Sequence, residues 1–166
     1  MVRIVSELGP ALVFGVDLGG VLPVLDRDVA DRWERTPEEV HRAAMENLRR
    51  RAARLSPAAV VEATMSGRVF RMLRHPKGFA SSLVLLPAEI ERLLGPGDQF
   101  LVAPASGLLL SFAPDIPTWV IAEITGEFED REPFPLLLDP FWYEDGRVTW
   151  AQDAVDPEGE EQPWTS

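Results

Sequence analysis

Hydrophobic and polar positions along the chain predict short strands that alternate with helices. Residues 11–16 and 21–25 are apolar enough for two strands, and the turn signal Gly19-Gly20 lies between them. We therefore expect the chain to begin with a β-hairpin.

The pattern then changes to a helical period. Asp26 can cap a short helix that reaches Trp33. Thr36, Pro37 and Glu39 occupy the N-cap, first and third positions typical of the start of a second helix. The apolar stripe of this second helix contains Val40, Ala44, Leu48 and Leu55, with Ala43 and Ala52 beside it. An amphipathic helix that ends before Ser56-Pro57 and packs on the rest of the molecule is expected.

The remaining pattern predicts hairpins separated by shorter helices. The expected strands cover residues 60–64, 69–74, 99–103, 108–112, 141–144 and 147–150, with the clearest turn at Ser66-Gly67. The expected helices cover residues 87–94 and 117–128, and residues 82–86 fit either a strand or a helical turn. In the helix over 117–128, the inward stripe contains Ile116, Val120, Ile124 and Phe128. Trp119 falls on the opposite face of this helix and should be open to solvent.

This order of elements predicts an α+β fold, with a mainly antiparallel sheet and helices packed on one face. A chain of 166 residues can bury a core as a single domain. We expect the domain to span residues 1–151. Residues 152–166 are acidic and rich in Pro and Gly, which predicts a disordered tail.

Composition narrows the possible chemistry. The chain contains no Cys, which excludes disulfides, thiolate metal sites and Cys nucleophiles. Its two His residues, His41 and His75, are far apart in sequence, so we expect no metal site and no cofactor. Uninterrupted apolar runs do not approach the ~20 residues of a membrane helix, so a cytoplasmic protein without a membrane partner is expected.

The net charge of −11 is unevenly distributed. Residues 1–55 carry nine basic and nine acidic side chains, residues 56–113 carry five and four, and residues 114–166 carry two and fourteen. An acidic chain repels phosphate backbones, and its one basic cluster, Arg49-Arg50-Arg51 with Arg54, fits a solvated helix face better than a nucleic-acid site. We therefore expect no nucleic-acid partner.

Three motifs resemble catalytic or ligand sites but have simpler interpretations. The stretch VFGVDLGG over residues 13–20 is similar to the phosphate-binding hairpin of sugar kinases, but Val21-Leu22-Pro23 stands where those enzymes need Thr or Ser, so a plain turn is favoured. Ser106 could act as a nucleophile activated by His75 or His41. The G-x-S-x-G motif typical of such a serine is absent around it, so an ordinary turn residue is favoured. His75 fits a solvated loop, and His41 fits a partly buried structural position. The carboxylate pairs Asp26/Asp28 and Glu129/Asp130 occur in expected caps or loops.

Aromatic residues and negative charge concentrate in the last third of the chain. The candidate binding residues are Trp119, Trp142 and Tyr143, together with the loop and strand residues Arg71, His75 and Ser106. An exposed Trp favours a protein interface, so we expect a non-enzymatic binding or regulatory module. Its partner would be another protein or a second copy in a homodimer, bound through this aromatic and acidic surface or through an exposed edge of the sheet. The alternative is a small hydrolase with a loop cleft near His75, Arg71 and Ser106.

The order of several short segments resembles the YtpQ-like family of bacterial proteins, which is classed as a domain of unknown function. The matching segments are Val16-Asp17-Leu18-Gly19, Asp26-Arg27-Asp28, Trp33, Thr36, residues 43–48, Val69-Phe70-Arg71, Gly78-Phe79-Ala80-Ser81, Leu101-Val102-Ala103-Pro104 and residues 142–147. Together they cover most of residues 11–150. The resemblance implies a shared fold and the hairpin around Asp17, without an established activity.

Two loops depart from that family pattern. His75-Pro76-Lys77-Gly78 and Ala105-Ser106-Gly107 stand where relatives have polar or acidic loops, so a site built there would be altered. The order of elements between residues 37 and 128 is also similar to that of small acidic secretion chaperones, which bind extended client segments. A flat sheet face with exposed apolar grooves would support that second alternative.

Overall fold

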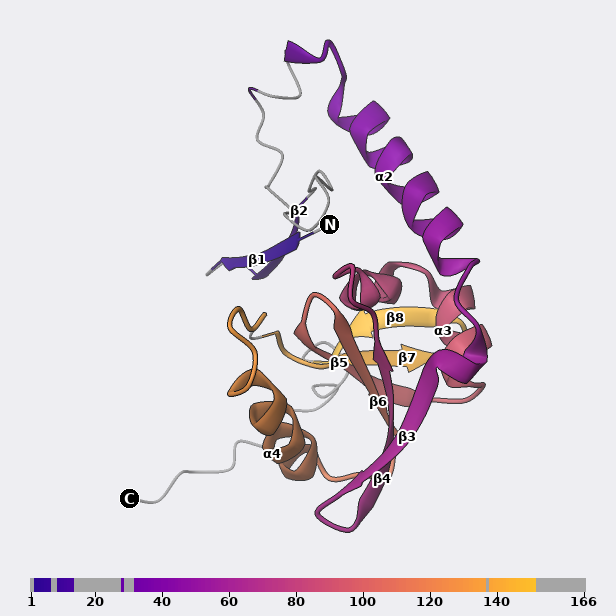
Figure 1. Ribbon diagram of the computed structural model, residues 1–166, viewed down its shortest axis with the longest axis vertical. Helices are drawn as coiled ribbons and strands as arrows, with labels where there is room; N and C mark the ends of the chain where they lie inside the picture. Colours follow the sequence, from indigo (N-terminus) through magenta and orange to yellow (C-terminus); the bar gives the residue numbers. More distant parts are fainter. Residues whose placement is uncertain (1, 7–8, 14–27, 29–31, 137, 152–166) are drawn as a thin grey trace, which may run out of the picture.

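The computed structural model describes residues 2–6, 9–13, 28, 32–136 and 138–151. Six strands form one antiparallel sheet in the order β3-β4-β6-β5-β7-β8 (Figure 1). The strands are β3 (Val60–Met65), β4 (Arg68–Arg74), β5 (Gln99–Ala105), β6 (Leu108–Phe112), β7 (Phe141–Glu144) and β8 (Arg147–Trp150). The sheet is strongly twisted, with β3 and β4 at a steep angle to β7 and β8. The α+β fold predicted for a single domain is confirmed.

A separate two-stranded sheet lies at the start of the chain. It pairs β1 (Val2–Ser6) with β2 (Gly9–Val13) in antiparallel register. Part of the strand expected over residues 11–16 is therefore present, but its described partner is β1, which the sequence pattern did not suggest. Residues 14–27, with the expected strand over 21–25 and the motif around Asp17, lie outside the described residues, as do most of the short helix before Trp33 and the tail over 152–166.

The helices match the predicted order closely. They are α2 (Pro37–Ala52), α3 (Pro87–Leu94) and α4 (Thr118–Glu129), with the 3₁₀ helices η1 (Pro57–Ala59) and η2 (Ala80–Leu85). The expected cap of α2 is present, because Glu39 N–H donates to Thr36 Oγ1 at 3.3 Å and Thr36 N–H donates to Glu39 Oε2 at 3.0 Å. The segment that fitted either a strand or a helical turn is η2.

Helices cover both faces of the sheet, and the expectation of one covered face is wrong. The α3-side core is built around Leu73, Phe79, Leu83, Ile90, Leu94, Leu101 and Leu109. The α4-side core is built around Phe70, Val102, Leu110, Phe112, Val120 and Ile124. All five residues of β6 are buried, which is typical of a strand covered on both faces. This near-continuous apolar run was the signal in the sequence for two layers.

Helix α2 contacts the body of the molecule mainly through its C-terminal part. Leu48 and Ala52 are its buried residues, and the helix extends from there away from the sheet (Figure 1). Arg92 of α3 holds the C-terminal end of α2, because its guanidinium donates to Ala52 O and Leu55 O, both at 2.9 Å. Among the described helices, none combines the length and the apolar character needed to cross a membrane.

Candidate functional site

The structure places the six candidate residues in separate parts of the fold. His75 and Ser106 lie in two adjacent loops at one end of the sheet, Arg71 and Tyr143 lie near the C-terminal end of α3, and Trp119 and Trp142 lie on the α4 side of the sheet. They therefore do not form a single site.

The two loops at the end of the sheet are joined through their backbones. His75 N–H donates to Gly107 O at 2.8 Å, and the amide and hydroxyl of Ser81 both donate to Ser106 O, at 3.2 and 3.1 Å. A Cβ atom on Gly107 would lie 2.8 Å from His75 O, so only glycine fits this close approach. The loops over residues 75–78 and 105–107 thus pack against each other through their backbones.

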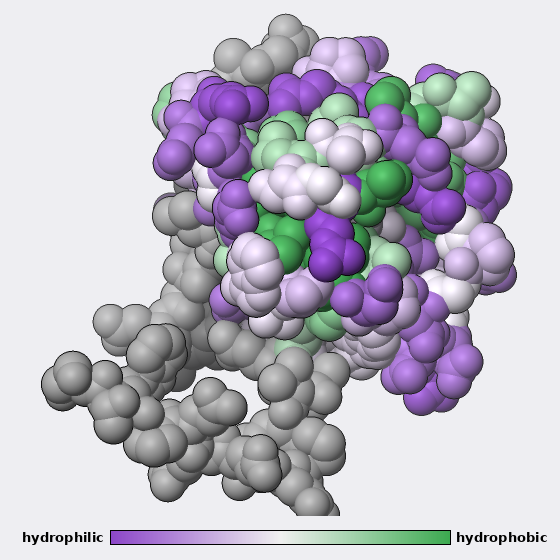
Figure 2. Space-filling model, turned by 90° about the horizontal axis from the view of Figure 1, so that it is seen from below, coloured by the Kyte–Doolittle hydropathy of each residue, from purple (hydrophilic) through white to green (hydrophobic). Residues whose placement is uncertain are grey.

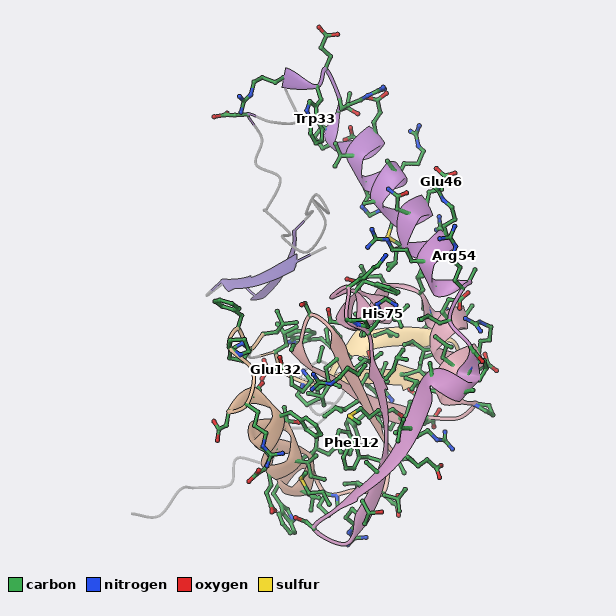
Figure 3. All side chains as sticks on the ribbon, in the orientation of Figure 1. Trp33, Glu46, Arg54, His75, Phe112 and Glu132 are labelled. Atoms are coloured by element: carbon green, nitrogen blue, oxygen red, sulfur yellow. The ribbon has the colours of Figure 1, made fainter. Side chains whose placement is uncertain are left out.

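The His75 side chain is held away from a catalytic arrangement. Its Nδ1 accepts a hydrogen bond from Lys77 N–H at 3.2 Å, and its ring centroid lies 4.3 Å from that of Phe79, below the C-terminal end of α2 (Figure 3). Burial, with smaller contributions from Lys77 and Arg51, lowers the pKa of His75 below its ordinary value. Within the described part of the chain, no hydrogen bond joins this imidazole to the Ser106 hydroxyl, so the pair expected for a hydrolase is not formed.

Arg71 is committed to the end of α3. Its guanidinium donates to Leu94 O, and its Nε lies 3.5 Å from Glu62 Oε1. Gly95 ends the helix with φ +94, and a Cβ atom there would lie 2.8 Å from Arg71 Nη1. His75 lies four positions after Arg71, just beyond the end of β4, or about 13 Å along an extended strand. Arg71 therefore stabilises a helix terminus and does not line a cleft with His75.

A buried polar network continues from Arg71 along the same face of the sheet. Ser111 Oγ donates to Gln99 Oε1 at 2.5 Å, and Gln99 Nε2 donates to Gly95 O at 3.1 Å. Tyr143 is buried, and its hydroxyl lies 3.4 Å from Glu91 Oε2. Burial and the nearby Glu91 raise the pKa of Tyr143. Tyr143, which the sequence suggested as a binding residue, is thus part of the core.

The two tryptophan candidates differ in exposure. Trp142 is half-buried on the α4 side of the sheet, with its ring centroid 4.5 Å from that of Phe100. Trp119 has 67% of its surface exposed, as its position on the helix predicted. Phe134, which follows α4, is 85% exposed. Trp119 lies in the first turn of α4 and Phe134 follows the end of the helix by five residues, so the length of the helix, about 15 Å, lies between them along the chain.

The structure also places His41, Arg51 and the described acidic side chains that were considered as site residues. His41 is exposed, so the expected partly buried position is wrong. The guanidinium carbon of Arg51 lies 5.9 Å from the centroid of the Phe79 ring, within the range of a cation–π contact. Across the described residues, His, Asp and Glu side chains do not gather in groups of three or more that could hold a metal ion.

The three loops around Gly78, Ser106 and Asp145 do not converge. Strand β7 runs antiparallel to β5, with Tyr143 opposite Gln99 and Phe141 opposite Leu101. The turn at Asp145 therefore lies beyond the first residue of β5, whereas Ser106 follows the last. The first two loops meet at one end of the sheet, and the third lies at the other.

Sequence reasoning did not single out the exposed side chains of the β3–β4 hairpin. Val61 and Val69 are 54% and 55% exposed, and this hairpin reaches the lower end of the molecule in Figure 1. Seen from that end, hydrophobic side chains reach the surface among hydrophilic ones (Figure 2). The signal in the sequence was a β-branched strand, residues 60–64, that contains one charged residue and neither Lys nor Pro.

Comparisons with models of known protein families, with curated proteins and with solved structures gave no significant match. Membership of the YtpQ-like family therefore stays a prediction from the segments quoted above. The secretion-chaperone alternative meets a structural difficulty, because both faces of the described sheet are covered, whereas that alternative needs an exposed sheet face.

Proposed function

We propose that this protein is a non-enzymatic protein-binding module whose contact surface is the outer face of α4. The observation that supports this proposal is the exposure of Trp119, at 67%, on a helix whose inner residues Val120, Ile121 and Ile124 are buried. A large aromatic side chain that contributes nothing to the core is typical of an interface anchor. The partner is another protein or a second copy of the chain, encountered in the cytoplasm.

The charge around Trp119 defines the chemistry of the partner. Glu123 and Glu127 are exposed on the same helix, and residues 114–136 carry six acidic side chains against one basic one. Such a surface attracts Lys and Arg and repels phosphate groups. A partner surface with an apolar pocket for the indole and basic residues at its rim fits best.

Affinity capture with paired tryptophan variants tests this function. Trp33 is also exposed, at 51%, but it precedes α2, so Trp33→Ala is a matched control for Trp119→Ala. Proteins captured by the tagged full chain are identified, and the affinity of each is then measured with purified components.

Trp119→Ala should weaken the relevant complex by roughly 2 kcal/mol or more, as expected for a hot-spot tryptophan, and Trp33→Ala should leave it unchanged. Equal affinity for the wild type and the Trp119→Ala variant would contradict the assignment of this surface. Thermal unfolding of both variants checks that neither change disturbs the fold.

A further inference from the structure

Strand β3 is an edge that lacks the usual protection against strand pairing. Within the described sheets, its one neighbour is β4, with which it forms six consecutive pairs without a bulge. Natural edge strands are commonly shortened, bulged or supplied with Lys or Pro. β3 has none of these features, and Val61, Glu62 and Thr64 are exposed. The opposite edge, β8, is shorter and begins with Arg147.

The sequence of β3 is complementary to itself. When two copies of a strand pair about a two-fold axis perpendicular to the sheet, each residue must face one whose side chain lies on the same side of the sheet. The axis therefore passes beside one residue, which faces its own copy. Axes at Glu62 and at Ala63 both give five consecutive pairs within Val60–Met65, more than the other choices.

Charge separates these two registers. An axis at Glu62 places two carboxylates directly opposite each other, which is unfavourable in an antiparallel pair. An axis at Ala63 places Glu62 opposite Thr64 of the second copy. It also places Val61, which is 54% exposed, opposite Met65 of the second copy.

The second register also extends the α4-side core. Ala63 and Met65 already pack against that core, and Val61 lies on the same side of the sheet because it pairs with Met72. In the paired form, Val61, Ala63 and Met65 of both copies make one continuous apolar strip. Met65 of the second copy then covers the exposed apolar surface of Val61.

We propose that two copies of the chain associate through antiparallel pairing of their β3 strands, with the two-fold axis at Ala63, to form a continuous twelve-stranded sheet from the two six-stranded ones. This dimer goes beyond the proposed function, which concerns the outer face of α4. It uses an edge of the sheet and leaves the Trp119 face of α4 free for another protein.

Replacement of Thr64 by an acidic and, separately, by a basic residue tests both the dimer and its register. Thr64 faces Glu62 of the second copy in the proposed pairing, so Thr64→Glu places like charges opposite each other twice. Dimerisation should weaken between about 2- and 30-fold, whereas Thr64→Lys should maintain or strengthen it. Thr149→Glu makes the same change on an exposed residue of the other edge strand, β8, and should have no effect.

Sedimentation equilibrium over a range of concentrations, at low and high salt, measures the effect. The wild-type full chain should approach twice its 18.5 kDa mass as concentration rises, and the difference between the two Thr64 variants should decrease in high salt. Thermal unfolding of the dilute proteins checks that the variants fold. Val61→Lys, a change at a second exposed position, should also weaken the dimer if Thr64→Glu fails to fold.

Two results would overturn the proposal. A wild-type chain that stays at 18.5 kDa at every concentration has no such dimer, even where an extended peptide of another protein binds the edge. Equal weakening by Thr64→Glu and Thr64→Lys shows that Thr64 does not face Glu62. Neither result bears on Trp119, because Trp119→Ala should leave the dimer unchanged while it weakens binding of another protein to α4.

Discussion

Thr125 lies in α4 and is buried. Among the residues that the structure describes, its hydroxyl is the buried polar side-chain group that has no hydrogen-bond partner. A buried hydroxyl that is not hydrogen-bonded loses its contacts with water without replacement. Thr125→Val keeps the branched shape and removes this group, so the free energy of unfolding should rise by about 1 kcal/mol. Urea unfolding at neutral pH measures the change. A decrease for the valine variant would show that the hydroxyl has a favourable contact in solution.

At the scale of single residues, the sequence predicts those roles that depend on near neighbours. The Thr36 cap was predictable because its partner Glu39 is three positions away. The exposure of Trp119 followed from helical spacing alone. Arg71 and Tyr143 were misplaced because their partners, Leu94 and Glu91, come from another part of the chain. An isolated Arg or Tyr in a strand pattern does not show whether it faces solvent or a helix terminus.

At the scale of elements, one arginine joins two helices. Arg92 of α3 donates to Ala52 O and Leu55 O at the C-terminal end of α2, and its Nε donates to Glu89 Oε2 at 2.8 Å. The carbonyl groups at a helix C-terminus lack partners within the helix, and a guanidinium supplies several donors at once. The position of α2 therefore depends on a side chain of α3.

Arg92→Leu should lower the free energy of unfolding by about 1–2 kcal/mol, because it removes these charged donors while it keeps an apolar stem at a partly exposed site. It should also increase hydrogen exchange in the last turn of α2. Arg50 is exposed on α2 and bonds to Asn47 in the same helix, so Arg50→Leu is the matched control and should change stability by less than about 0.5 kcal/mol. Similar effects of the two changes would contradict the role given to Arg92.

The elements themselves were largely predictable, whereas their layering was not. Pro87 lies at the start of α3 and Gly95 at its end, and the turn at Ser66-Gly67 separates two strands, so these boundaries are local features of the chain. Which face of a sheet a helix covers depends on the path of the connections. The buried run in β6 indicates two covered faces, but it does not identify α3 and α4 as the helices that cover them.

At the scale of the whole molecule, the two cores share the central strands. In β6, Leu109 belongs to the α3-side core, and its neighbour Leu110 belongs to the α4-side core. Both are fully buried, at 0% exposure. Loss of either core removes the surface on which the other is built, so the six-stranded sheet and its two helical layers should unfold together.

Leu109→Ala and Leu110→Ala therefore form a matched pair that differs only in the layer affected. Each change should lower the free energy of unfolding by about 3 kcal/mol, because it deletes a buried leucine side chain and leaves a cavity. Each variant should still unfold in one transition, with the same midpoint by far-UV circular dichroism and by tryptophan fluorescence. Hydrogen exchange should accelerate in both α3 and α4, whichever leucine is replaced. If Leu109→Ala instead exposed α3 while α4 stayed protected, the layers would be independent units, and β6 would hold each of them without coupling one to the other.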